Sequence, residues 1–186
     1  VGPTGKWADT WVHHACGCAA FWDVHLHTGS RRILATGLRN PHGMAWEPES
    51  GALWTAVNER DELGSDLVPD YLTSVKDGGF YGWPYSYYGQ HVDVRVKPPR
   101  PDLVASAVSP DYALGSHVAP LGIAFSQATA LPPPLTRGLF VVEPGSWPRV
   151  PPRRSHLSFW PLLPSRPPGF PGGCLTDCRL PCALSC

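Results

Sequence analysis

Three acidic side chains lie close together in the middle of the chain, at Asp61, Glu62 and Asp66. Carboxylate oxygens are hard ligands of the kind that Ca²⁺ prefers, so their spacing allows a structural calcium site. The alternative is a solvated acidic loop, because most carboxylates serve only to hydrate a surface. We favour this second interpretation for each of the three taken singly.

Cysteine recurs at every fourth position near the end of the chain, at Cys174, Cys178, Cys182 and Cys186. Zinc sites usually take two closely spaced pairs with a longer gap between the pairs, which this spacing does not provide. Even spacing would place the thiols on one face of a helix, but Pro181 argues against a helix there. We therefore expect no designed metal site, and Cys16 and Cys18 add little to one.

Other candidate side chains have an ordinary structural explanation when each is considered locally. Arg39 reads as a surface arginine paired with an acid, and Asn40 as a turn residue before a proline. A lone histidine such as His117 is more often a hydrogen-bonded structural residue than a ligand. Tyr81 and Trp83 could form flat walls of a pocket, although buried aromatics more often pack in the core.

The composition limits the elements that could position these residues. The 186 residues are 42% hydrophobic and only 16% charged, which is enough for one domain with a real core. Basic and acidic residues number 15 each, so no excess of charge favours nucleic acid or an anionic membrane, and no apolar run is long enough to span a bilayer. The first residues do not resemble a secretory signal. The 19 Gly, 23 Pro and 8 Trp favour short strands and many turns.

The chain divides into three parts by composition. Residues 1–18 are irregular, residues 19–147 read as globular sequence, and residues 148–186 are rich in Pro, Arg and Cys with little strand or helix pattern. A change of reading frame in a GC-rich gene would explain the composition of the last part. We therefore expect irregular termini on either side of one structured region.

Short apolar runs bounded by turn residues predict strands in the middle part. They cover residues 20–26, 32–35, 43–47, 52–58, 122–126 and 138–143. The Pro, Ser and Gly between residues 47 and 52 predict a hairpin. Residues 61–76 are polar and contain Pro69, so we expect a long loop there with one helical turn at residues 71–76. The glycines of residues 78–84 predict a tight corner packed with aromatic rings.

Three motifs in this order resemble the glucose/sorbosone dehydrogenase family, and residues 115–147 extend the match loosely. The motifs are GLRNPHGMAW at 37–46, LWTAVNERDE at 53–62 and DGGFYGWP at 77–84. The resemblance covers about two-thirds of the chain but well under half of a family member, because these enzymes are six-bladed β-propellers. It implies an all-β fold, a partial β-propeller of about two to three blades.

The family resemblance also implies a site for pyrroloquinoline quinone (PQQ) and calcium. By this resemblance, the cofactor-binding residues are Arg39, Asn40, His117 and Arg149. The backbone carbonyls of Glu59 and Arg60 would hold Ca²⁺, although the best-known glucose enzymes have Gly-Pro at this point. Carbonyl ligation needs no particular side chain, so this departure does not exclude the metal.

The expected chemistry follows from the same resemblance. In the intact family a histidine base removes the sugar hydroxyl proton, and hydride passes from the sugar C1 to the quinone, which Ca²⁺ and arginine polarise. No counterpart of that base is visible in this sequence, so we assign no catalytic residue. The partners would be a sugar and an external electron acceptor, in the periplasm or outside the cell. The alternative is a non-catalytic propeller module for interaction or sugar binding, because fold alone does not decide function. A metal module built on the Cys-rich tail ranks third.

Overall fold

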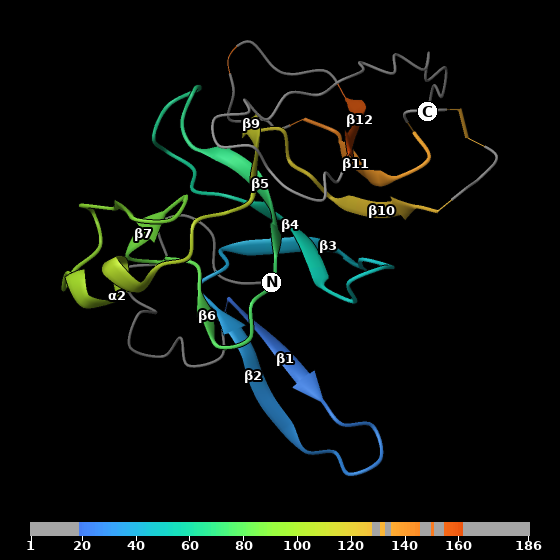
Figure 1. Ribbon diagram of the computed structural model, residues 1–186. Coiled ribbons are helices and arrows are strands. Elements are labelled where there is room, and N and C mark those ends of the chain that lie inside the picture. Colours follow the sequence, from blue (N-terminus) through green and yellow to red (C-terminus); the bar gives the residue numbers. More distant parts are fainter. Residues whose placement is uncertain (1–18, 128–130, 133–134, 146–149, 151–154, 162–186) are drawn as a thin grey trace.

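The computed structural model describes residues 19–127, 131–132, 135–145, 150 and 155–161, and they fold almost entirely into short β-strands (Figure 1). The strands are β1 (Ala20–Val24), β2 (Arg31–Thr36), β3 (Asn40–Trp46), β4 (Leu53–Asn58), β5 (Pro69–Ser74), β6 (Gly79–Phe80), β7 (Ser86–Tyr87), β8 (His91–Val92), β9 (Tyr112–Ser116), β10 (Gly122–Ser126), β11 (Gly138–Glu143) and β12 (His156–Pro161). One short helix, α2 (Pro101–Ser106), follows β8. Arg149, residues 1–18 and the tail cysteines lie outside the described residues.

The strands form successive sheets in chain order. The central sheet has the order β3-β4-β5-β9 and is antiparallel throughout. The first sheet is β1-β2-β6, in which β6 runs parallel to β2, and the last sheet is β10-β11-β12. A small pair, β7-β8, accompanies the helix at one side (Figure 1). Successive sheets of this kind, antiparallel except for the short pairing of β2 with β6, are propeller blades, which confirms the expected all-β, partial β-propeller fold.

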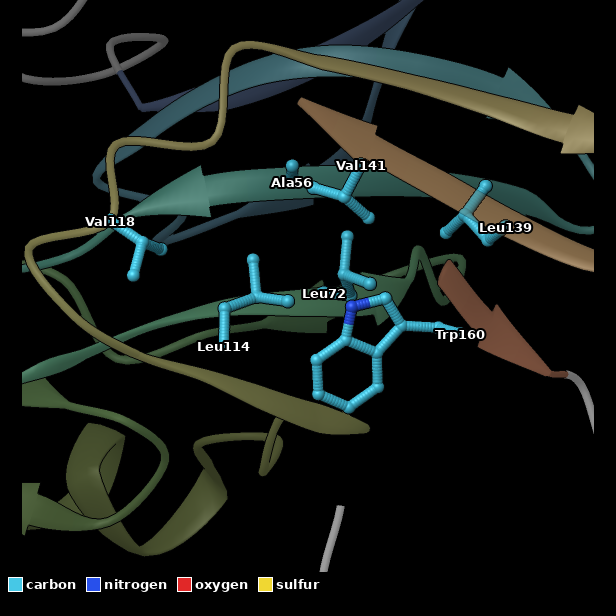
Figure 2. Packing of buried hydrophobic residues seen from close by; sticks show 7 residues of the cluster. All are labelled: Ala56, Leu72, Leu114, Val118, Leu139, Val141 and Trp160. Carbon is cyan, nitrogen blue, oxygen red and sulfur yellow. The ribbon is translucent and has the colours of Figure 1, made fainter. Parts of the chain in front are cut away.

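Two apolar clusters join the sheets face to face. Between the central and last sheets, the side chains of Ala56, Leu72, Leu114, Val118, Leu139, Val141 and Trp160 point toward one another (Figure 2). Between the first and central sheets, the buried cluster is Phe21, Ala35, Leu38, Val57, Tyr71 and Tyr81. The central sheet is therefore covered on both faces, which explains why burial runs continuously through β4 and β5 instead of alternating along each strand.

Glycine allows two close approaches that fix the arrangement of the sheets. A Cβ on Gly43 of β3 would lie 2.7 Å from the backbone nitrogen of Ile123 in β10, so these strands of adjacent sheets can meet only because that atom is absent. A Cβ on Gly37 would lie 2.7 Å from the ring of Phe80, and Gly37 also has φ of +75°. The second contact confirms the expected aromatic corner at residues 78–84.

The sequence-based expectations hold for most strands and fail at residues 61–76. The predicted hairpin forms, with the Glu47 N–H donating to the Ala52 carbonyl at 2.8 Å. The expected long loop with a helical turn at residues 71–76 is wrong, because β5 occupies Pro69–Ser74 between β4 and β9. Proline is tolerated there because it is the first residue of the strand.

The last strand is also unexpected, because β12 lies inside the segment, residues 148–186, that was expected to be irregular. Its residues pair with β11 along the whole strand, from Glu143 opposite His156 to Gly138 opposite Pro161. Pairing with a preformed neighbour supplies backbone hydrogen bonds that a local sequence pattern does not reveal. No helix in the described part of the chain is long and apolar enough to cross a bilayer.

Candidate functional site

The candidate site lies where β3 begins and β4 ends. Antiparallel pairing places Asn40 opposite Asn58, so the residue before β3, Arg39, faces the loop that follows β4. We call residues 58–61 the 58–61 loop. The register of one hairpin thus brings together two motifs that lie about 20 residues apart in the sequence, and Asn40 is half-buried beside them.

Arg39 is buried, with 3% of its surface exposed, and its guanidinium contacts the 58–61 loop directly. Nη1 donates to the carbonyl of Glu59 and, at 3.4 Å, to that of Asn58. Nη2 lies 2.6 Å from Asp61 Oδ2 and forms an ion pair with it. Arg39 therefore contacts the carbonyls of Asn58 and Glu59 and the carboxylate of Asp61. Nε of Arg39 is buried without a hydrogen-bond partner in the described residues.

His117 comes to the same place from the end of β9. It has a left-handed backbone, with φ of 54°, and 4% of its surface is exposed. Its Nε2 lies 2.9 Å from the Gly64 carbonyl and 3.0 Å from the Leu67 carbonyl. Because both partners are acceptors, Nε2 carries the proton. Nδ1 lies 3.7 Å from Asp61 Oδ1, so Asp61 sits between Arg39 and His117.

Two carboxylates are buried at this site, one of Glu59 in the loop itself and one of Asp70 in β5. Burial raises the pKa of Glu59 from 4.5 to about 7, against the opposing effects of the Tyr88 N–H and the charge of Arg39. Burial likewise raises the pKa of Asp70 from 3.8 to about 6, opposed by hydrogen bonds from the Glu59 and Ala119 N–H groups. Each of those two N–H groups donates to Asp70 at 2.8 Å. Asp70 of β5 therefore ties the 58–61 loop to the chain after His117.

Arg60 points to a different set of partners. Its Nε lies 2.6 Å from Asp93 Oδ2 in an ion pair, and its guanidinium lies 4.6 Å from the ring centroid of Trp83. The guanidinium of Arg39 lies 5.7 Å from the same ring. Trp83 is thus buried against two cations rather than only packed between blades. Sequence analysis missed Asp93 altogether, because no local pattern connects it to residue 60.

The charged side chains of the site pair with one another, as Arg39 does with Asp61 and Arg60 with Asp93, and they do not form a metal site. No cluster of three or more His, Cys, Asp or Glu side chains suited to a metal occurs among the described residues. The side-chain calcium site considered for Asp61, Glu62 and Asp66 is therefore not formed. The oxygens that lie around the Arg39 guanidinium are the backbone carbonyls of Asn58 and Glu59 and the carboxylate of Asp61. The predicted ligand roles of Arg39, Asn40, His117, Glu59 and Arg60 remain predictions, and Arg149 lies outside the described residues.

Comparison with known proteins gives the family and the fold of this chain. Residues 23–142 match the family model described as Glucose / Sorbosone dehydrogenase. The chain is 30% identical over 137 residues to an uncharacterized protein of Borreliella burgdorferi, covering 72% of this chain and 35% of that protein. It is 31% identical over 107 residues to aldose sugar dehydrogenase YliI of Escherichia coli, covering 56% of this chain and 27% of the relative. The chain thus spans about a third of the length of the curated relatives that it matches.

Solved structures resemble the chain in fold. The calcium structure of the Trichoderma reesei Carbohydrate-Active Enzymes Family AA12 protein has a TM-score of 0.61 at 19% identity, covering 70% of this chain and 38% of that one. The holo form of the pyranose dehydrogenase PQQ domain from Coprinopsis cinerea has a TM-score of 0.56 at 22% identity, covering 79% and 43%. The match of the family model to residues 23–142, over more than half of the sequence, shows that this chain belongs to the glucose/sorbosone dehydrogenase family.

Proposed function

We propose that this chain carries part of the cofactor site of a PQQ-dependent sugar dehydrogenase, which oxidises an aldose or sorbosone and passes electrons to an external acceptor. The observation that carries the proposal is the contact between the buried Arg39 guanidinium and the Glu59 carbonyl, in a chain of this family. Arg39 and Asn40, with His117 and Arg149, would contact PQQ. The carbonyls of Glu59 and Arg60 would bind Ca²⁺.

The groups at the site fit these two ligands chemically. Peptide carbonyls are the hard, neutral oxygens that Ca²⁺ accepts, and a carbonyl oxygen has two lone pairs, so Glu59 can bind a metal while it accepts from Arg39. The planar fork of Arg39 suits a carboxylate or a quinone oxygen. Its buried Nε lacks a hydrogen-bond partner within the described part of the chain, and a buried donor of this kind costs free energy until it is satisfied.

The chain's own residues bind and orient rather than move protons. When bound, PQQ supplies the two-electron acceptor and Ca²⁺ supplies the Lewis acid. Arg39 holds positive charge where negative charge develops, and the Asp61 carboxylate fixes its guanidinium. His117 holds residues 64–67 through its Nε2 proton, which leaves that nitrogen engaged. We assign no base, and we expect this chain alone to bind PQQ without oxidising sugar.

Binding is tested by titrating the purified chain with PQQ in the presence of Ca²⁺ and following tryptophan fluorescence. Trp83 lies against Arg39, so a ligand at this site should quench part of the emission. We expect Arg39→Lys to weaken binding about tenfold or more, because an ammonium group cannot contact two oxygens as a fork. Arg137→Lys is the matched control, since Arg137 pairs with Glu49 on the surface. Equal affinity in the wild type and Arg39→Lys would exclude Arg39 from the site.

Turnover is tested separately with a dye-linked dehydrogenase assay. The chain is supplied with PQQ, Ca²⁺ and an aldose, and the aldose sugar dehydrogenase of Escherichia coli serves as the positive control. We expect PQQ binding with no dye reduction by the chain alone. Dye reduction by the chain would show that a base is present and was misplaced. Sugar binding that needs neither PQQ nor Ca²⁺ would instead support the non-catalytic module.

A further inference from the structure

The segment between β6 and α2, residues 84–96, lies against the 58–61 loop, and we call it the 84–96 segment. It contains the short pair β7-β8, which sits beside α2 at the edge of the molecule (Figure 1). Three of its residues reach the 58–61 loop or the residue after it. They are Tyr88, Asp93 and Arg95.

Asp93 makes the shortest of these contacts, and at Arg60 it is an ion pair without hydrogen-bond geometry. Its side chain is 2% exposed, and Oδ2 lies 2.6 Å from Nε of Arg60, whose side chain is 9% exposed. The same carboxylate accepts from Arg95, with Oδ1 2.9 Å from Nε and Oδ2 3.0 Å from Nη2. Burial tends to raise the pKa of Asp93, but the hydrogen bonds from Arg95 and the charges of Arg60 and Arg95 lower it below its ordinary value. Asp93 is therefore an ionised, buried anchor for Arg60.

The neighbouring contacts hold the loop at adjacent positions. The backbone N–H of Tyr88 donates to Glu59 Oε2 at 3.2 Å, while the N–H of Arg60 donates to Glu59 Oε1 at 3.0 Å. Arg95 Nη1 donates to the Glu62 carbonyl at 3.3 Å. The 84–96 segment thus contacts residues 59, 60 and 62 through Tyr88, Asp93 and Arg95. Arg39 contacts the carbonyls of residues 58 and 59.

The side chain of Arg60 is oriented by its contacts with Asp93 and Trp83. Asp93 binds its guanidinium while Trp83 lies 4.6 Å beneath it, so the side chain is fixed by an anion and by a ring face. Fixing the side chain also limits rotation of the peptide groups on either side of it. Those peptide groups carry the carbonyls of Glu59 and Arg60, so the contacts of Asp93 act together with the hydrogen bond from Arg39 to the Glu59 carbonyl.

We propose that Asp93 is a positioning residue that acts through Arg60 to hold the Glu59 and Arg60 carbonyls in the geometry needed to bind a divalent cation. The inference rests on the proposed function for its metal, but not for the contact itself. Residues that orient the groups around a metal commonly change metal affinity 10- to 100-fold when they are replaced, which is roughly the effect expected here.

The first experiment measures how readily the 58–61 loop opens when no ligand is present. Amide hydrogen exchange is followed by NMR at Arg60 and Tyr88, with Val57 of β4 and Leu72 of β5 as reporters of the whole fold. In Asp93→Asn, we expect exchange at Arg60 and Tyr88 to accelerate about tenfold or more while the strand amides change little. Asp102→Asn is the matched control, because Asp102 forms an exposed ion pair with Arg100. Unchanged exchange at Arg60 and Tyr88 in Asp93→Asn would overturn the proposal.

The second experiment measures cation binding with Tb³⁺ as a luminescent substitute for Ca²⁺, excited through tryptophan. We expect Asp93→Asn to weaken Tb³⁺ binding about tenfold and Asp102→Asn to leave it unchanged. Equal Tb³⁺ affinity in the wild type and Asp93→Asn would overturn the positioning role. If the wild type binds no Tb³⁺, the calcium part of the proposed function fails, and the exchange data still decide whether Asp93 holds the loop.

A second variant guards against misfolding, because Asp93→Asn leaves a buried arginine without its anion. In Arg60→Met/Asp93→Asn both charges are removed together, methionine still packs on Trp83, and asparagine still accepts from Arg95. This double variant should fold with strand amides protected as in the wild type. We expect its Tyr88 amide to exchange faster and its Tb³⁺ affinity to fall as in Asp93→Asn. Wild-type values for both in a folded double variant would also overturn the proposal.

Discussion

Arg39 Nη2 and Asp61 Oδ2 lie 2.6 Å apart in an ion pair in which the arginine side chain is 3% exposed and the aspartate side chain 29% exposed. The arginine is thus almost fully desolvated while its partner still reaches solvent. Such a pair anchors a buried cation at the 58–61 loop, where a ligand carboxylate could compete with Asp61 for the same donors. This asymmetry makes Asp61 the side chain whose replacement best reports on the charge of the site.

Asp61→Asn should destabilise the chain by about 1–3 kcal/mol, because the buried guanidinium keeps its two carbonyl partners but loses its anion. The measurement is the free energy of unfolding from urea titrations. Asp23→Asn is the control, since Asp23 pairs with Arg32 on the surface and should cost about 0–0.5 kcal/mol. An equal decrease in the free energy of unfolding for the two variants would mean that burial of Arg39 does not strengthen its ion pair with Asp61.

Gly43→Ala should separate β3 from β10. The added Cβ would lie 2.7 Å from a backbone nitrogen, which cannot move as a flexible side chain can, so we expect a loss of about 1–3 kcal/mol. Gly122→Ala is a close control in the neighbouring strand, because its Cβ would meet nothing nearer than 4.0 Å. That variant should be neutral or slightly stabilising, since alanine lowers the entropy of the unfolded chain. Thermal unfolding of both variants separates the two effects.

Leu139→Ala should weaken the packing between the central and last sheets. Leu139 is fully buried in the cluster of Figure 2, so the transfer and cavity terms together predict a loss of about 2–5 kcal/mol. Leu26→Ala, at a side chain that is 92% exposed, should change stability by less than about 0.5 kcal/mol. A small loss at Leu139 would indicate that the last sheet is not docked in solution.

The stability of the chain should fall as the pH rises from about 4.5 to about 7. Glu59 has a pKa raised from 4.5 to about 7, so the folded chain holds a proton that the unfolded chain has released. The stabilisation is present below pH 4.5 and is lost as the pH rises through the folded value, and Asp70 adds the same sign between 3.8 and about 6. The change is on the order of 1–3 kcal/mol for Glu59.

The matching variant is Glu59→Gln, which removes the titrating group. Urea titrations across this pH range should show a shallower decline in the free energy of unfolding for Glu59→Gln than for the wild type. Glu62→Gln is the control for loss of a carboxylate, at the exposed position that follows the 58–61 loop. A Glu59→Gln slope identical to that of the wild type would show that folding does not raise the pKa of Glu59.

The sequence by itself determined much of the local structure. Runs of apolar residues bounded by turns gave β10 and β11 their observed limits, because each strand is short and ends at polar or glycine residues. The turn chemistry between residues 47 and 52 fixed the β3–β4 hairpin, and the hairpin register then placed Arg39 against the loop after β4. The family motifs contain both partners of that contact, so their association was predictable.

Only the tertiary structure decided the remainder, because it depends on contacts between distant residues. β5 is buried on both faces between β4 and β9, so it lacks the alternation that reveals a half-exposed strand. β12 exists because β11 offers it an edge to pair with. Asp93 reaches Arg60 across 33 residues, and Trp83 underlies two arginines, through packing of the 84–96 segment that no local pattern encodes. Local propensity acts over a few residues, whereas a buried ion pair is selected by the environment that the whole fold creates.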